Sequence, residues 1–116
     1  DGTPSQIILE DRSDGQQQAI AEGFVPGRGP KVKAEVLDHF GVQAIEHAKS
    51  ASGCWAVIDE VGFLESASPA YCRALLRLFD QKRVAAVLRK KDTALIGAIR
   101  SRTDAVCFDL DNFEKE

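Results

Sequence analysis

The hydrophobic pattern near the amino end is that of paired strands. Apolar runs at residues 7–9 and 19–21 lie on either side of a polar link that contains Asp14-Gly15. An Asp-Gly pair between two apolar runs is a turn signal, so we expect a β-hairpin. Residues 23–31 hold three glycines and two prolines. Neither a helix nor a central strand tolerates that content, so this stretch is expected to be a loop.

From residue 32 onward, strand-like and helix-like patterns follow one another. Residues 32–40 begin with apolar side chains at every second position, which predicts a strand that Gly41 ends. Residues 42–51 have helical spacing. Residues 54–58 are apolar throughout, which is typical of a strand buried on both faces by helices. The later segments are predicted as a helix that starts at Pro69 with Ser68 as its N-cap, a strand at 83–89, a helix at 92–102 and a strand at 104–110.

This order of helices and strands predicts the fold. Strands that alternate with helices over short connections run parallel and are joined by right-handed crossovers. We therefore expect an α/β protein with a three-layer, mostly parallel sheet and an amino-terminal β-hairpin, in a single domain over residues 1–116. In such sheets ligands bind outside the carboxyl ends of the strands. The positions of interest are Asp59 and Glu60, residues 89–91 and residues 109–112.

Composition and charge are those of a folded cytoplasmic domain. The 116 residues are 44% hydrophobic and 28% charged, with a formal net charge of −3. A negative balance argues against a surface that binds nucleic acid. No apolar run approaches the roughly 18 residues of a membrane span, and no charged-then-apolar leader opens the chain. We expect neither membrane insertion nor secretion.

The cysteines and histidines do not indicate a metal site. Cys54, Cys72 and Cys107 contain no C-x-x-C pair and lie in apolar runs, which predicts buried free thiols in a reducing compartment. His39 and His47 have no Cys, Asp or His partner at the spacing of metal ligands. A metal site at either histidine is therefore not expected.

Two adjacent carboxylates, Asp59 and Glu60, follow the apolar run at residues 54–58. This is the pattern of a Walker B motif. The first carboxylate holds Mg²⁺ through its water shell, and the second orients or deprotonates the water that attacks a phosphoryl group. Gly62 would let the backbone turn away and leave room for a phosphate. On the pattern alone, a strand that ends in acidic residues because solvent begins there is the alternative.

Two basic stretches are candidates for binding the phosphates of a nucleotide. The glycines of PGRGPK lack the spacing of a phosphate-binding G-x-x-x-x-G-K-[ST] loop, which favours an ordinary loop from which Lys31 and Lys33 would reach a nucleotide. Arg89 is expected on the same sheet edge as Asp59 and Glu60, where a cation stabilises charge on a transferred phosphoryl group. A solvated loop is the alternative interpretation of this second stretch.

The run WAVIDEVGFLE, with GPKVKAEVLDHFGVQAI before it and VAAVLRKKD and IRSRTDAVCFDL after it, resembles the small P-loop nucleoside-triphosphatases of the THEP type. The resemblance spans roughly residues 5–113. It implies a P-loop fold, ATP or GTP as substrate and Mg²⁺ as cofactor. It also implies that Asp59 assists Mg²⁺ binding and that Glu60 activates the attacking water. Gly62 and Glu65 match further positions of the motif.

Proteins of this family begin with a strand and a G-x-x-x-x-G-K-[ST] loop that cradles the phosphates. That portion is absent from the sequence, as is any methionine. We therefore expect the chain to be the carboxyl-terminal two-thirds of the domain, without the first strand and P-loop helix, and to supply the Walker B half of the site in the full-length parent. One alternative is a non-catalytic scaffold or regulatory interaction domain that self-associates through an exposed sheet edge. Another is a phosphotransfer enzyme with a hydroxyl acceptor.

Overall fold

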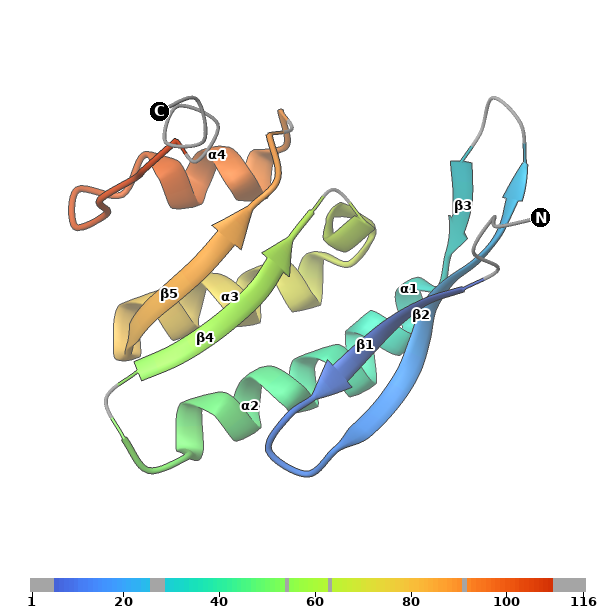
Figure 1. Cartoon of the computed structure of the whole chain (residues 1–116), viewed down its shortest axis with the longest axis horizontal. Helices are drawn as coiled ribbons and strands as arrows, with labels where there is room; N and C mark the ends of the chain where they lie inside the picture. Colours follow the sequence, from blue (N-terminus) through green and yellow to red (C-terminus); the bar gives the residue numbers. More distant parts are fainter. Residues whose placement is uncertain (1–5, 26–28, 54, 63, 91, 110–116) are drawn as a thin grey trace.

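The computed structural model describes residues 6–25, 29–53, 55–62, 64–90 and 92–109. These residues form two sheets with associated helices (Figure 1). One sheet is antiparallel with the strand order β1-β2-β3, and the other is the parallel pair β4-β5. The protein is thus of the mixed α/β class, as the sequence predicts.

The predicted hairpin is confirmed. Strand β1 (Gln6–Asp11) pairs antiparallel with β2 (Gln16–Val25). Gly15 in the connecting turn has a φ of +76°, a left-handed conformation that favours glycine, and its N–H donates to the carbonyl of Asp11 at 2.8 Å. The Asp-Gly signal therefore marks the turn for a steric reason.

The predicted loop at residues 23–31 is wrong at both of its ends. Strand β2 continues through Val25, and β3 (Gly29–Val32) pairs antiparallel with it. The register of β2 with β3 shifts between Glu22 and Phe24, so the pairing of the two strands is irregular at Gly23. Residues 26–28 lie outside the described part of the chain.

A continuous helical segment follows β3. It consists of α1 (Ala34–Val36), the π-helical segment η1 (Leu37–Gly41) and α2 (Val42–Ser50). The predicted strand at residues 32–40 is therefore wrong beyond its first residue. The predicted helix at residues 42–51 is confirmed as α2.

The side chains that become buried explain why this segment is helical. Leu37, Phe40 and Ile45 are 0%, 6% and 4% exposed and recur at helical spacing, which outweighs the short alternation at the start of the segment. Gly41 does not end the helix. A Cβ at Gly41 would lie 2.8 Å from Cδ1 of Tyr71, so the absent side chain lets the next long helix approach closely.

The parallel pair is built around one helical crossover. Strand β4 (Trp55–Val61) leads through the 3₁₀ turn η2 (Leu64–Ala67) to α3 (Pro69–Gln81), which returns to β5 (Arg83–Leu88). Ser68 caps α3 as predicted, because its Oγ accepts a hydrogen bond from the N–H of Tyr71 at 3.1 Å. In Figure 1, α3 lies behind the β4-β5 pair.

Helix α4 (Ala94–Arg100) confirms the predicted helix at residues 92–102, and Thr93 caps it. The predicted strand at residues 104–110 is wrong, because residues 104–109 form no strand; residue 110 lies outside the described residues. The described residues hold two parallel and three antiparallel strands, so a mostly parallel sheet is not found among them. None of the helices in this part of the chain is long and apolar enough to span a membrane.

One face of the β4-β5 pair is covered and the other is not. Ala56 and Val61 of β4 are 6% and 0% exposed, whereas Trp55 and Val57 are 60% and 74% exposed. The prediction that this strand is buried on both faces is therefore wrong for the described residues, because the helices pack on one side only. The core consists of Ile20, Leu37, Ile45, Ala56, Val61, Tyr71, Ala74, Leu75, Leu78, Leu95, Ile96 and Ile99.

Candidate active site

Asp59 and Glu60 lie near the carboxyl end of β4, inside the strand rather than after it. Asp59 pairs with Val87 and Val61 with Leu88, which leaves Glu60 opposite no residue of β5. An extra residue of this kind changes the alternation of side chains along a strand. Asp59 and Glu60 are consequently both exposed while Val61 is fully buried. The peptide bond between Asp59 and Glu60 is cis.

Arg89 lies beside this carboxylate pair. Its backbone N–H donates to the carbonyl of Val61 at 2.9 Å, which fixes the end of β5 against the end of β4. Its Nε is 3.9 Å from Oε2 of Glu60, a loose ion pair whose side chains are 52% and 42% exposed. The expectation that Arg89 lies on the same edge of the sheet as Glu60 is confirmed.

The neighbouring residues at this edge are described in part. Lys90 forms an ion pair with Asp109 at 2.9 Å, so the segment after α4 also reaches the end of β5. Residue 91 and residues 110–112, which the sequence places at the same edge, lie outside the described residues.

The turn after β4 is held by Glu65. The N–H of Gly62 donates to both carboxylate oxygens of Glu65, each at 3.2 Å, and Glu65 is 8% exposed. Gly62 does not have a positive φ, and a Cβ there would lie 3.4 Å from Cδ of Arg89 and 3.7 Å from Oε1 of Glu65. Both are ordinary contact distances. The chain therefore turns at Gly62 without a conformation that favours glycine, and the expected room for a phosphate beside it stays a prediction.

A polar network ties this turn to two helices. The Oγ of Ser68 donates to Oδ1 of Asp38 at 2.5 Å, and the thiol of Cys72 donates to the carbonyl of Glu65 at 3.2 Å. Burial, followed by the nearby Glu65 carboxylate, raises the pKa of Cys72. Asp38 is not a candidate on the sequence alone, because the alternating pattern at residues 32–40 predicts a strand there. Only the helical spacing of the apolar residues Leu37, Phe40 and Ile45 indicates that Asp38 lies on a helix.

Lys31 and Lys33 do not join the carboxylate pair in this structure. The Nζ of Lys33 lies 2.7 Å from Oε1 of Glu22 in β2, and the hydrogen bond from Lys33, with a second from Gln6, lowers the pKa of Glu22. Lys31 stands opposite Glu22 in the β2-β3 ladder. In Figure 1, β3 and α1 lie to the side of the carboxyl end of β4. In the described residues Lys31 therefore belongs to β3, and Lys33 directly follows that strand and forms its ion pair with β2.

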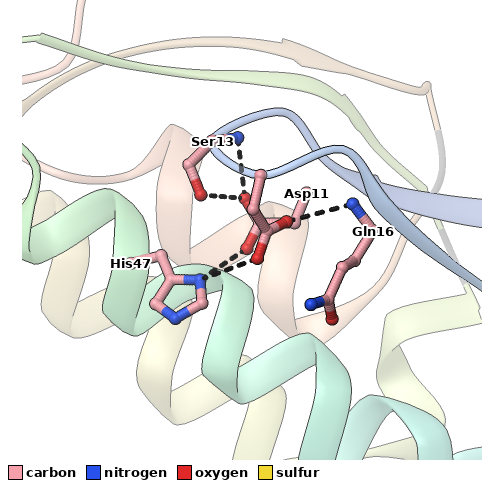
Figure 2. Close-up of polar contacts among 5 residues, drawn as sticks. Asp11, Ser13, Gln16 and His47 are labelled. Carbon is pink, nitrogen blue, oxygen red and sulfur yellow. Dashed lines mark hydrogen bonds and ion pairs between the residues drawn. The ribbon is translucent and has the colours of Figure 1, made fainter.

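A second polar cluster lies elsewhere in the molecule. Nδ1 of His47 is 2.7 Å from Oδ2 of Asp11 (Figure 2). Burial raises the pKa of Asp11, but hydrogen bonds from Ser13 and His47 outweigh burial and lower it overall. The sequence offers His47 no partner at the spacing of metal ligands, because Asp11 lies 36 residues away and only the fold brings the two side chains together.

The cysteines differ in their surroundings. Cys72 and Cys107 are free thiols, as predicted, but Cys107 is exposed and Cys72 is partly buried. The expectation of burial is therefore wrong for Cys107, which follows α4 where no strand forms. Cys54 lies outside the described residues.

The described residues define an α/β protein with an exposed carboxylate pair and an arginine at the carboxyl ends of two parallel strands, the edge where sheets of this class bind ligands. The family described as NTPase matches residues 8–116, and the chain belongs to this family. The resemblance stated from the motifs is thereby confirmed.

Two curated relatives are similar to the chain. Nucleoside-triphosphatase THEP1 of Thermotoga sp. (strain RQ2) is 29% identical over 102 residues, which cover 84% of this chain and 58% of the relative. Nucleoside-triphosphatase THEP1 of Thermotoga maritima is 28% identical over the same length and the same shares. The chain thus spans less than two-thirds of the length of these relatives. No solved structure gives a significant match.

Proposed function

We propose that the protein containing this chain is a Mg²⁺-dependent nucleoside-triphosphatase that hydrolyses ATP or GTP, and that this chain supplies the metal-binding and water-activating carboxylates. The observation that carries the proposal is the exposure of Asp59 and Glu60 side by side at the carboxyl end of β4, in a chain of the NTPase family. In the proposed complete domain, β4 and β5 belong to a three-layer, mostly parallel P-loop sheet.

The two carboxylates have separate roles. Mg²⁺ keeps several of its waters when bound to proteins, and Asp59 would hold the ion through these waters. Glu60 would accept the proton of the water that attacks the γ-phosphoryl group, or orient that water for attack. Both roles require side chains that substrate and solvent reach, and both side chains are exposed.

Arg89 supplies positive charge beside the reacting phosphoryl group. Its ion pair with Glu60 is 3.9 Å long and half exposed, so moving the guanidinium from Glu60 to a phosphate oxygen costs little. The guanidinium offers five N–H donors, and no hydrogen bond joins it to Glu60 at the 3.9 Å between Nε and Oε2. A phosphate contact by Lys31 or Lys33 stays a prediction, and Lys33 would first have to leave Glu22, 2.7 Å away.

The remaining phosphate contacts are assigned to the part of the protein outside this chain. The alignment covers 58% of each curated relative, so the activity is proposed for the whole protein and not for these residues alone. Backbone N–H groups at a helix amino terminus are the ordinary means of binding the β- and γ-phosphates.

The proposal is tested by hydrolysis of Mg²⁺-ATP and Mg²⁺-GTP with protein expressed from the complete coding sequence. Asp59→Asn should raise the Mg²⁺ concentration for half-maximal rate about tenfold or more, as for other residues that act through a metal's outer ligands. Asp80→Asn is the matched control, because Asp80 is an exposed carboxylate at the far end of α3. If the parent protein, Asp59→Asn and Asp80→Asn all reach half-maximal rate at the same Mg²⁺ concentration, the role of Asp59 is contradicted.

A non-catalytic interaction domain is the second candidate, favoured by the apolar face of the β4-β5 pair. Trp55, Val57 and Val87 are 60%, 74% and 44% exposed. This candidate predicts that the complete protein binds neither nucleotide and self-associates, and that Val57→Lys weakens the association measured by sedimentation. Mg²⁺-dependent turnover would exclude it.

A further inference from the structure

Three potential metal ligands converge where the β1-β2 turn packs against α2. Oδ2 of Asp11 lies 2.7 Å from Nδ1 of His47 (Figure 2). Oδ2 of Asp14 lies 4.0 Å from the same nitrogen. One ligand atom from each of the three residues can be chosen so that all lie within 4.8 Å of one another. The two carboxylates come from the β1-β2 hairpin and the histidine comes from α2, so the cluster joins segments that are far apart in the sequence.

The turn orients both carboxylates. Oδ1 of Asp11 accepts hydrogen bonds from the N–H of Ser13 at 3.0 Å and from its hydroxyl at 2.6 Å. Oδ1 of Asp14 accepts from the N–H of Gln16 at 3.0 Å. Each carboxylate therefore uses one oxygen to hold the turn and directs the other toward His47. Supporting hydrogen bonds of this kind are what fixes ligand orientation in metal sites.

We propose that Asp11, Asp14 and His47 form a binding site for a divalent transition-metal ion, with Zn²⁺ as the best fit. One imidazole nitrogen with two carboxylate oxygens suits Zn²⁺, whereas Mg²⁺ and Ca²⁺ prefer oxygen ligands alone. The ion takes the place of the proton between Nδ1 and Oδ2 of Asp11, and any proton on Nδ1 leaves to solvent or moves to Nε2.

The observed distances fit this exchange. Ligand atoms about 2.0 to 2.2 Å from a tetrahedral Zn²⁺ lie about 3.3 Å from one another. The separations of 2.7 Å and 4.0 Å from Nδ1 of His47 lie on either side of that value, and all three ligand atoms lie within 4.8 Å of one another, so the cluster reaches the geometry of the ion through side-chain rotation. A shallow depression lined by Ser13, Asp14, His47, Ser50 and Ala51 leaves the fourth position open to water or to a further ligand.

The site is distinct from the proposed catalytic edge. Figure 1 places the β1-β2 turn beside α2 and away from the carboxyl end of β4. Asp11 is 7% exposed and ends β1, whereas His47 belongs to α2, so a bound ion would join the hairpin to the helix. Its binding would stabilise the folded state, because the unfolded chain does not hold the three ligands together.

Zn²⁺ titration of the full chain by calorimetry, after treatment with a chelator, tests the proposal. We expect one ion per chain and a rise in Tm of about 10 °C at a Zn²⁺ concentration 100-fold above Kd. Loss of a residue that only supports a ligand costs about tenfold to 100-fold, so Asp14→Asn and His47→Gln, which change ligands themselves, should weaken binding by about 100-fold or more. His39→Gln, which changes an exposed histidine outside the cluster, should bind as the parent does.

The variants also distinguish a metal site from an ion pair and from Zn²⁺ binding by cysteines. If His47→Gln fails to fold, Asp14→Asn decides, because an amide at position 14 keeps the acceptor for the N–H of Gln16 and leaves the Asp11 contact intact. Binding to free thiols would persist in Asp14→Asn. The absence of binding, or binding equal in the parent and Asp14→Asn, overturns the proposal and leaves an ion pair that only holds the hairpin to the helix.

Discussion

Replacing Ser68 with alanine would disconnect the turn after β4 from the two helices that support it. Ser68 is 0% exposed, and its Oγ both accepts from the N–H of Tyr71 at 3.1 Å and donates to Oδ1 of Asp38. Ser68→Ala removes both bonds at once. The residues of the proposed site stay unchanged, so the variant measures the scaffold and not the chemistry.

The expected loss of stability follows from these two bonds. Loss of an N-cap hydroxyl costs about 1 kcal/mol, and a hydrogen bond to a charged group contributes about 1.5 to 3 kcal/mol. The lower part of the second range applies because Asp38 is exposed and water replaces the lost donor. We expect a decrease of about 2 to 3 kcal/mol in the free energy of unfolding, or about 10 °C in Tm for a chain of this size.

Urea unfolding followed by circular dichroism measures this loss. Ser66→Ala is the matched control, because Ser66 is exposed in the same turn. A double-mutant cycle with Asp38→Ala should give an interaction energy of about 1 kcal/mol or more between Asp38 and Ser68. If Ser68→Ala unfolds like Ser66→Ala, or if the two changes are additive, the network does not support the turn as described.

Two further predictions concern packing and thiol reactivity. Gly97→Ala should stabilise the protein by about 0.5 to 1 kcal/mol, because a Cβ there meets nothing within 4 Å, whereas Gly41→Ala should lower Tm because its Cβ would press on the buried ring of Tyr71. Equal stabilisation by both would refute the close helix contact. Because burial raises the pKa of Cys72, less of its thiolate is present at pH 8, and peptide mapping after iodoacetamide treatment should find Cys72 alkylated more slowly than the exposed Cys107. Raising the pH should increase the rate at Cys72, and equal rates for the two thiols at pH 8 would contradict this assignment.

Local signals in the sequence predicted the elements whose causes are local. Asp14-Gly15 marked the hairpin because Gly15 adopts a positive φ, and Ser68 with Pro69 marked the start of α3 because capping involves neighbouring residues. The parallel order of β4 and β5 followed from the helix between them. The hairpin turn and the helix cap depend on interactions within a few residues, and the strand order depends on the crossover that joins the two strands.

The errors have causes that lie elsewhere in the chain. Gly41 was expected to end a strand, but it lies within a helix where the ring of Tyr71 packs closely against it. The apolar run at residues 54–58 suggests a strand covered on both faces, but only one face is covered by the described helices. The hydrophobic pattern of a segment does not show which distant residues pack against it.

The candidate site divides in the same way. Asp59, Glu60 and Arg89 were predicted to share an edge because the ends of neighbouring parallel strands meet. His47 and Asp11 were not paired, since their contact requires the hairpin to pack against α2 across 36 residues of sequence. Chemistry that follows from strand order was predictable, and chemistry that follows from packing was not.

Glu60→Gln, measured in protein from the complete coding sequence, tests the central claim most directly. Glutamine keeps the size of the side chain and removes its ability to accept a proton, and Glu46→Gln makes the same change at an exposed position on α2. The measurement is kcat for Mg²⁺-ATP and Mg²⁺-GTP hydrolysis together with nucleotide affinity. The account predicts that kcat falls about 100-fold or more in Glu60→Gln while nucleotide binding and the Glu46→Gln enzyme stay at the parent level. Turnover by Glu60→Gln at the parent rate would contradict it.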